Sequence, residues 1–166
     1  MTANVHGPEV TVPQLFAPAL AKANQWLSDI RAQCDLHDLH QAYTLLRAVF
    51  FTIRDWSGVL DNISLTEKLP MLLRGIYYEG WKAVEPRDEV RTIGDFYDTI
   101  KYHLGTTPGP LADNLELNTI NALQVIRVHL PQGDFKKVMN AVPEDMRKLV
   151  SLSTLPTARQ TTHAGA

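Results

Sequence analysis

Apolar residues recur in the middle of the chain at the spacing of an amphipathic helix. Between positions 42 and 53 they follow one another at intervals of three and one, which places them on one stripe of a helix. The stripe consists of Ala42, Leu45, Leu46, Val49, Phe50 and Ile53. It predicts a long helix facing the core, with Asp38 placed to cap its first turn.

Further helix boundaries follow from proline, glycine and capping patterns. Pro70 and Pro143 each fit the first position of a helix, where a missing N–H does no harm. Gly80 fits the left-handed residue that ends the helix starting at Pro70. Thr92 followed by Asp95 has the spacing of a capping box. Because no alternating strand pattern competes, the sequence predicts an all-α protein.

The two halves of the chain also resemble each other. Three residues of the stripe, Leu46, Val49 and Ile53, match Leu123, Ile126 and Leu130 at one constant offset. At a second offset, Leu65, Leu69, Pro70, Leu73 and Arg74 match Val138, Val142, Pro143, Met146 and Arg147. Each half would present an apolar face too wide for its own helices to cover. We therefore expect an internally duplicated helical bundle, with two similar halves of three to four helices packed together.

The ends and the middle of the chain set the expected boundaries. The first residues hold prolines and a glycine without periodicity, and the last are small, polar and turn-prone. The expected organisation is an extended N-terminal arm (1–18), one helical domain (19–151) made of two halves (19–81 and 92–151) and a connector (82–91), and a flexible tail (152–166).

Composition narrows the classes of function. Hydrophobic residues make up 45% of the chain and charged residues 20%, which is ordinary for a folded protein. The 16 Lys and Arg are scattered among 18 Asp and Glu, which argues against nucleic acid as a partner. No apolar run approaches the length of a membrane span, and the N-terminus lacks the pattern of a secretory signal. With the single cysteine Cys34, these features predict a cytoplasmic protein.

Three segments carry a resemblance to a known family. They read "AYTLLRAVFFTIRD", "LPMLLRGIYYEGW" and "ALQVIRVHLPQGDFKKVMNAVPEDMRKL". Together they resemble the bacterial family called domain of unknown function 2267, over roughly residues 20–150. The resemblance implies an all-helical, internally duplicated cytoplasmic protein, and it implies no activity and no catalytic residue. The stretch "RDWSGVLDNISL" departs from the usual pattern of that family and leaves the path between Ile53 and Leu65 open.

Aromatic residues at the end of "LPMLLRGIYYEGW" are the leading candidates for a binding surface. The leucines of that segment match apolar residues in the second half and are expected in the core. Tyr77 and Tyr78 have no aromatic counterpart there, and neither does Trp56. Tyr and Trp suit both buried seams and interfaces, because a large ring carries a polar tip. We predict that Tyr77, Tyr78, Trp81 and Trp56 contact a partner, with a seam between the halves and a ligand cleft as alternatives.

The leading functional prediction is a non-catalytic module that binds another cytoplasmic protein or assembles with itself, without a cofactor. The second is a small-molecule or lipid-binding bundle, whose cleft between the halves is lined by Phe50, Phe51 and Phe96. The third is a metal-dependent enzyme that uses Cys34, His37 and His40, which are ligand types suited to zinc. A regular helix cannot gather these three residues around one ion, because the span of six residues turns too far about the axis.

Overall fold

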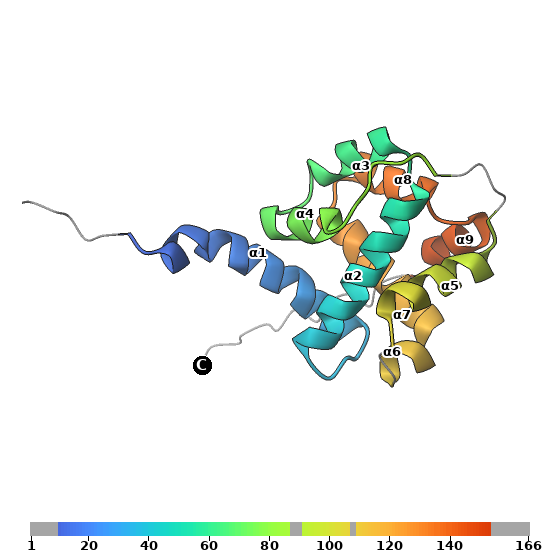
Figure 1. The fold of residues 1–166 in the computed structure, drawn as a ribbon. Coiled ribbons are helices and arrows are strands. Elements are labelled where there is room, and N and C mark those ends of the chain that lie inside the picture. The colour runs from blue at the N-terminus through green and yellow to red at the C-terminus, as the bar shows by residue number, and fades with distance from the viewer. Residues whose placement is uncertain (1–9, 87–90, 107–108, 154–166) are drawn as a thin grey trace, which may run out of the picture.

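The computed structural model describes residues 10–86, 91–106 and 109–153, and every regular element in these ranges is a helix (Figure 1). In chain order the helices are α1 (Val12–Gln33), α2 (Leu39–Trp56), α3 (Val59–Thr66), α4 (Met71–Tyr78), α5 (Ile93–Leu104), α6 (Pro110–Asp113), α7 (Leu115–His129), α8 (Gln132–Asn140) and α9 (Glu144–Leu152). The all-α prediction is confirmed for the described residues. None of these helices is long and apolar enough to cross a membrane.

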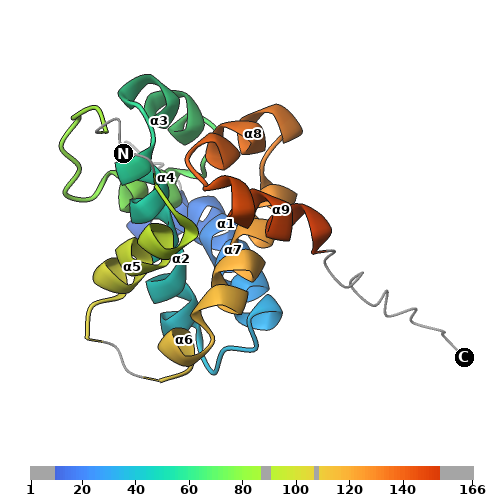
Figure 2. The ribbon, with the colours of Figure 1, turned by 90° about the vertical axis from the view of Figure 1, so that its right-hand side faces the viewer.

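The core lies around α2 and α7. The predicted stripe of α2 is buried throughout, from Ala42 at 0% exposed to Ile53 at 1%. Helix α2 packs against α1, α4, α5 and α7, while α7 also contacts α1, α8 and α9. Figure 2 shows α5 and α9 on the side of the body that faces away from the free end of α1. The two long central helices are therefore covered by helices from both halves of the chain.

Local sequence explains most of the helix starts. The Asp38 carboxylate accepts a 2.8 Å hydrogen bond from the Gln41 amide, as the cap prediction requires. Thr92 and Asp95 form the predicted capping box at the start of α5. Pro70 and Pro143 instead occupy the cap position, one residue before their helices begin. Gly80 has a φ of +67°, the left-handed conformation expected of it.

The prediction of an extended arm over residues 1–18 is wrong for its last seven residues. Helix α1 begins at Val12, where Thr11 and Gln14 form a capping box and Pro13 lies in the first turn. Pro13 is tolerated there because the first amides of a helix have no acceptor within it. Residues 1–9 lie outside the described part of the chain. Helix α1 therefore starts in the region that composition alone had marked as irregular.

The described part of the connector is anchored to the body. Residues 82–86 form no helix, but the Glu85 carboxylate accepts hydrogen bonds of 3.2 and 3.3 Å from the Val59 amide. That amide belongs to the first turn of α3, where a negative charge also favours the helix dipole. At the other end of the chain, α9 extends to Leu152, and the predicted tail beyond residue 153 lies outside the described residues.

Candidate interaction surfaces

Tyr77 belongs to the interior of the protein. Its side chain is 0% exposed, and its ring meets the Phe50 ring edge-on with centroids 5.4 Å apart. The hydroxyl donates a 2.5 Å hydrogen bond to the Asn62 side-chain oxygen, and burial raises the pKa of the phenol. The expectation that Tyr77 contacts a partner is therefore corrected, because this side chain is buried within the chain itself. Its spacing of four residues from Leu73 already placed it on the core face of α4.

Tyr78 and Trp81 are only partly buried and lie against each other. Their rings stack with centroids 5.2 Å apart and 28° between planes. The Tyr78 hydroxyl is 2.5 Å from the Thr66 hydroxyl, so the polar tip of the tyrosine is already engaged within the chain. The Trp81 amide donates to the Tyr78 carbonyl at 3.0 Å, in a turn that includes Gly80. These two rings form a small partly exposed patch at the end of α4.

Trp56 lies at a junction between helices. It is partly buried at the C-terminal end of α2, and its ring meets the Phe96 ring of α5 edge-on at 5.0 Å. The Arg91 guanidinium lies 4.7 Å above the indole. Trp56 therefore helps to join the second half of the chain to α2. This position matches the alternative prediction of a seam between the two halves and not a contact with a partner.

Phe50, Phe51 and Phe96 do not line an open cleft. They are 1%, 6% and 0% exposed, and they fill the interior between helices. Phe51 lies between two guanidinium groups, with Arg47 at 4.4 Å and Arg54 at 4.2 Å from the ring centre. The cleft predicted at these rings is therefore a packed contact between α2, α4 and α5.

The most densely bonded charged residue near these aromatics is Arg54, which sequence reasoning missed. It is 7% exposed and donates to the carbonyls of Tyr77 at 3.1 Å and Glu79 at 2.9 Å. Its Nε also donates to Asp55 at 3.1 Å. The carbonyls at the end of a helix have no partner within it, so Arg54 of α2 acts as a cap for α4. No local sequence signal announces such a contact, because its partners lie more than twenty residues away.

Cys34, His37 and His40 are not gathered into one site. The Cys34 thiol points to the Asn118 carbonyl of α7 at 3.7 Å, and burial raises its pKa to about 12. His37 and His40 are exposed on the far side of the turn that Asp38 caps. Among the residues that the structure describes, no group of three His, Cys, Asp or Glu side chains is arranged to hold a metal. The three predicted ligands therefore offer neither a metal site nor an activated thiol.

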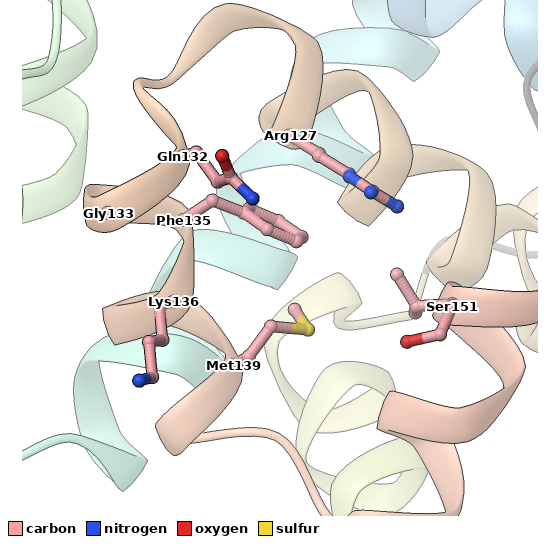
Figure 3. A pocket seen from close by; sticks show the side chains of 8 residues that line it. Arg127, Gln132, Gly133, Phe135, Lys136, Met139 and Ser151 are labelled. Carbon is pink, nitrogen blue, oxygen red and sulfur yellow. The ribbon is translucent and has the colours of Figure 1, made fainter.

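A hollow of about 560 Å³ lies between α7, α8 and α9 (Figure 3). Phe135 and Met139 point into it, and Arg127 reaches across its mouth towards Ser151. Lys136 lines the rim, with its ammonium group turned away from the centre. The hollow combines an apolar floor with a guanidinium at the edge. None of the residues that the sequence predicted for a partner surface or a ligand cleft lines it.

The N-terminal half of α1 carries exposed apolar side chains and projects from the body in Figure 1. Every residue from Val10 to Pro18 is exposed. Val12 is 66% exposed, Leu15 63%, Phe16 44% and Leu20 53%. These four side chains follow one another at helical intervals of three, one and four, so they share one face of the helix. Single exposed apolar residues are ordinary, but a contiguous face of this kind is typical of an interaction site.

Most of the helical body matches the model of a known protein family. A family model described as "Uncharacterized conserved protein (DUF2267)" matches residues 23–149. The chain belongs to the DUF2267 family. This confirms the resemblance noted in the sequence, and no curated protein matches the chain.

The DUF2267 match begins where α1 enters the body. Ala23 is the first matched residue, and it is also the first residue of α1 that packs partly against the core. Trp26 and Ile30, further along α1, are 2% and 0% exposed. The projecting half of α1 therefore lies outside the part of the chain that matches DUF2267, and the buried half lies within it.

Proposed function

We propose that this chain is a non-catalytic helical module that binds protein, either a second copy of itself or another partner, through the projecting half of α1. The single observation that supports this most is the exposed face formed by Val12, Leu15, Phe16 and Leu20. Leaving such a face in water is unfavourable, and a protein partner that covers it recovers the free energy of burial. A cytoplasmic location fits the one free thiol and is part of the same proposal.

The Tyr78–Trp81 patch is the second surface for this proposal. It is smaller and its tyrosine hydroxyl is already bonded to Thr66. We therefore rank it below the face of α1. The two surfaces are separable by mutation, because they lie on different segments of the chain and share no residue.

The experiment replaces apolar residues of one surface at a time in the full chain. Leu15→Gln combined with Phe16→Gln is expected to reduce self-association or capture of a partner after chemical cross-linking, with helical content unchanged by circular dichroism. Tyr78→Ala combined with Trp81→Ala is the matched pair and is expected to have the smaller effect. If both pairs leave every association unchanged, the proposal is wrong.

A second candidate is a module that binds small amphiphilic anions in the hollow between α7, α8 and α9. It is favoured by one arrangement, the Arg127 guanidinium at the edge of a hollow into which Phe135 and Met139 point. Native mass spectrometry separates the two candidates: a retained small mass, lost on Arg127→Ala substitution, would favour the ligand, and a dimer mass would favour association.

We also infer that the two halves of the chain arose by duplication. Matched positions are buried alike: Leu73 and Met146 are both 0% exposed, and Leu69 and Val142 are both 2% exposed. In each half a side chain of the long helix caps the last helix. Arg54 of α2 does so for α4, while the Gln124 amide of α7 donates to the carbonyls of Val150 and Ser153 at the end of α9. Separate superposition of α1–α4 on α5–α9 tests this inference.

A further inference from the structure

The apolar face of α1 continues without a break from the core into solvent. Six residues of the helix alternate at intervals of four and three, which is the spacing of a seam between paired helices. They are Val12, Phe16, Ala19, Ala23, Trp26 and Ile30. Trp26 and Ile30 already use this seam against the body, whereas Val12 and Phe16, which are 66% and 44% exposed, extend it outward into solvent. The free end of α1 therefore carries a seam prepared for a second helix.

We propose that this seam pairs with the same seam of a second copy of the chain, in antiparallel orientation. This deepens the function proposed above and rests on it. If the two-fold axis passes between Ala17 and Pro18, Phe16 of one copy faces Ala19 of the other, and Val12 faces Ala23. Leu15 then faces Leu20 at the edge of the seam. Each bulky residue of the exposed part of the seam, Val12 and Phe16, thus meets an alanine, and a two-fold pair repeats each contact twice.

The charges on α1 favour a second copy of the chain over a membrane surface or a nucleic acid as the partner of this seam. Between Thr11 and Ser28 the only charged residue is Lys22, which faces Pro13 in the proposed register. Two copies therefore meet without like-charge repulsion. An anionic membrane surface or a nucleic acid attracts helices that carry several Lys or Arg, and this segment does not.

Helix stability gives a second reason to expect a covering helix. A short helical segment with few tertiary contacts is marginal in water, and Pro18 in the exposed half of α1 removes one backbone hydrogen bond. Packing against a second α1 would supply the contacts that the body does not give. Because the segment lies outside the residues matched to DUF2267, the pairing would be an addition to that fold.

The size of the face sets the expected strength. Four large apolar side chains that are between 44% and 66% exposed offer on the order of 400 Å² of apolar surface per copy. Stable complexes bury about 800 Å² per partner, so the pair is expected to be weak and reversible. Sedimentation velocity on the full chain should show a dimer fraction that increases across the micromolar range.

Substitutions test the surface first. Leu15→Glu is expected to raise the dissociation constant at least about tenfold, because it places a charge in the apolar contact with Leu20. Leu60→Glu is the matched control, since Leu60 is an exposed leucine of α3, 79% exposed and outside the proposed interface. A change of the same size in both variants would overturn the proposal. Circular dichroism of each variant checks that the helical body is retained.

The antiparallel register has its own test. Leu20→Lys alone should weaken the dimer as Leu15→Glu does. Mixing the two variants should restore association between unlike chains, because residue 15 of one copy faces residue 20 of the other. A parallel pair would place residue 15 near residue 15 and would give no such recovery. Absence of recovery in the mixture would therefore overturn the antiparallel arrangement.

A full chain that stays monomeric at millimolar concentration would overturn the inference. The proposed function would then be judged separately. If the monomer captures a different protein and Leu15→Glu abolishes the capture, the broader proposal stands with another partner. If it instead binds vesicles of phosphatidylglycerol through the same face, or binds nothing at all, both proposals are wrong.

Discussion

The imidazole of His129 stacks on the indole of Trp26, with ring centroids 4.6 Å apart and 22° between planes. The contact joins the end of α7 to the part of α1 that enters the body. The Nε2 atom of His129 also lies 2.7 Å from the Asp29 carboxylate, one turn further along α1. One side chain of α7 therefore fixes α1 by a ring contact and by a hydrogen bond.

His129→Ala should reduce the free energy of unfolding by about 2 kcal/mol, because it removes a mostly buried ring from its stack with Trp26. His129→Phe keeps a ring and loses only the pair with Asp29, whose side chain is 50% exposed, so its effect should stay below about 1 kcal/mol. Urea unfolding measures both variants. Equal losses would show that the hydrogen bond with Asp29, and not the stack, holds α1 against α7.

Arg54→Met should reduce the free energy of unfolding by roughly 2–4 kcal/mol, because it leaves the Tyr77 and Glu79 carbonyls without their donor. Arg47→Met is the matched control. Both guanidinium groups flank the Phe51 ring, but among the described residues Arg47 bonds only to the half-exposed Glu79 carboxylate. Arg47→Met should reduce the free energy of unfolding by less than about 1 kcal/mol. Similar losses in chemical denaturation would contradict the capping role of Arg54.

The Cys34 thiol should react slowly with Ellman's reagent at pH 8 in the folded protein and rapidly in guanidinium chloride. Only the thiolate reacts, and burial raises the pKa of this thiol to about 12 in the folded chain, against roughly 8.5 when unfolded. Rapid reaction of the native protein would contradict the assignment of Cys34 as a buried, inert residue.

The same shift makes stability depend on alkaline pH. The unfolded chain loses the Cys34 proton first, so the contribution is complete below about pH 8.5 and is lost as the pH rises towards 12. Between these values the chain should lose stability faster than a Cys34→Ala variant does. Parallel curves for the two proteins would show that the thiol does not titrate differently on folding.

Asp55 should make the fold sensitive to acid. Burial raises the pKa of its carboxyl, but the hydrogen bond with His103 and the charge of Arg54 outweigh burial and lower the pKa overall. A lowered pKa stabilises the fold above the unfolded value of about 3.9, and this stabilisation is lost as the pH falls through the folded value. Asp55→Asn should therefore destabilise the protein at pH 7 and have little effect at pH 2.

Asp98→Asn is the control for this prediction. Asp98 lies on α5 near His103 in sequence, but its carboxylate is 76% exposed and pairs only with Lys101 in the described structure. Its substitution should leave the acid limb of the stability curve unchanged. Thermal unfolding between pH 2 and pH 7 compares the two variants. Identical curves for both would show that Asp55 does not contribute to the loss of stability in acid.

Periodicity predicted the body of the fold, but the sequence analysis missed the start of α1. The stripe from Ala42 to Ile53 was recoverable because three turns of one face are apolar without interruption. The start of α1 was missed because Pro8 and Pro13 suggested an irregular arm. Thr11 and Gln14 with Pro13 form a helix start, and the stripe from Val12 to Ala23 was the signal that could have revealed it.

The candidate site was harder to predict because exposure is a tertiary property. Tyr77 and Tyr78 are adjacent and chemically alike, yet one is 0% exposed and the other partly exposed. Only the helix phase separates them, and Leu73 four residues earlier sets that phase. The contacts of Arg54 and His129 join residues far apart in sequence, so no local pattern contains them.

The cap that Arg54 provides also bears on how the body opens. The last turn of a surface helix usually frays, and its amides exchange with deuterium through brief local openings. Here the end of α4 is held from inside by a side chain of the central helix, so those openings would require α2 to separate from its neighbours as well. The end of α4 should consequently exchange as slowly as the centre of the protein, which makes a short helix near the surface a reporter of global unfolding.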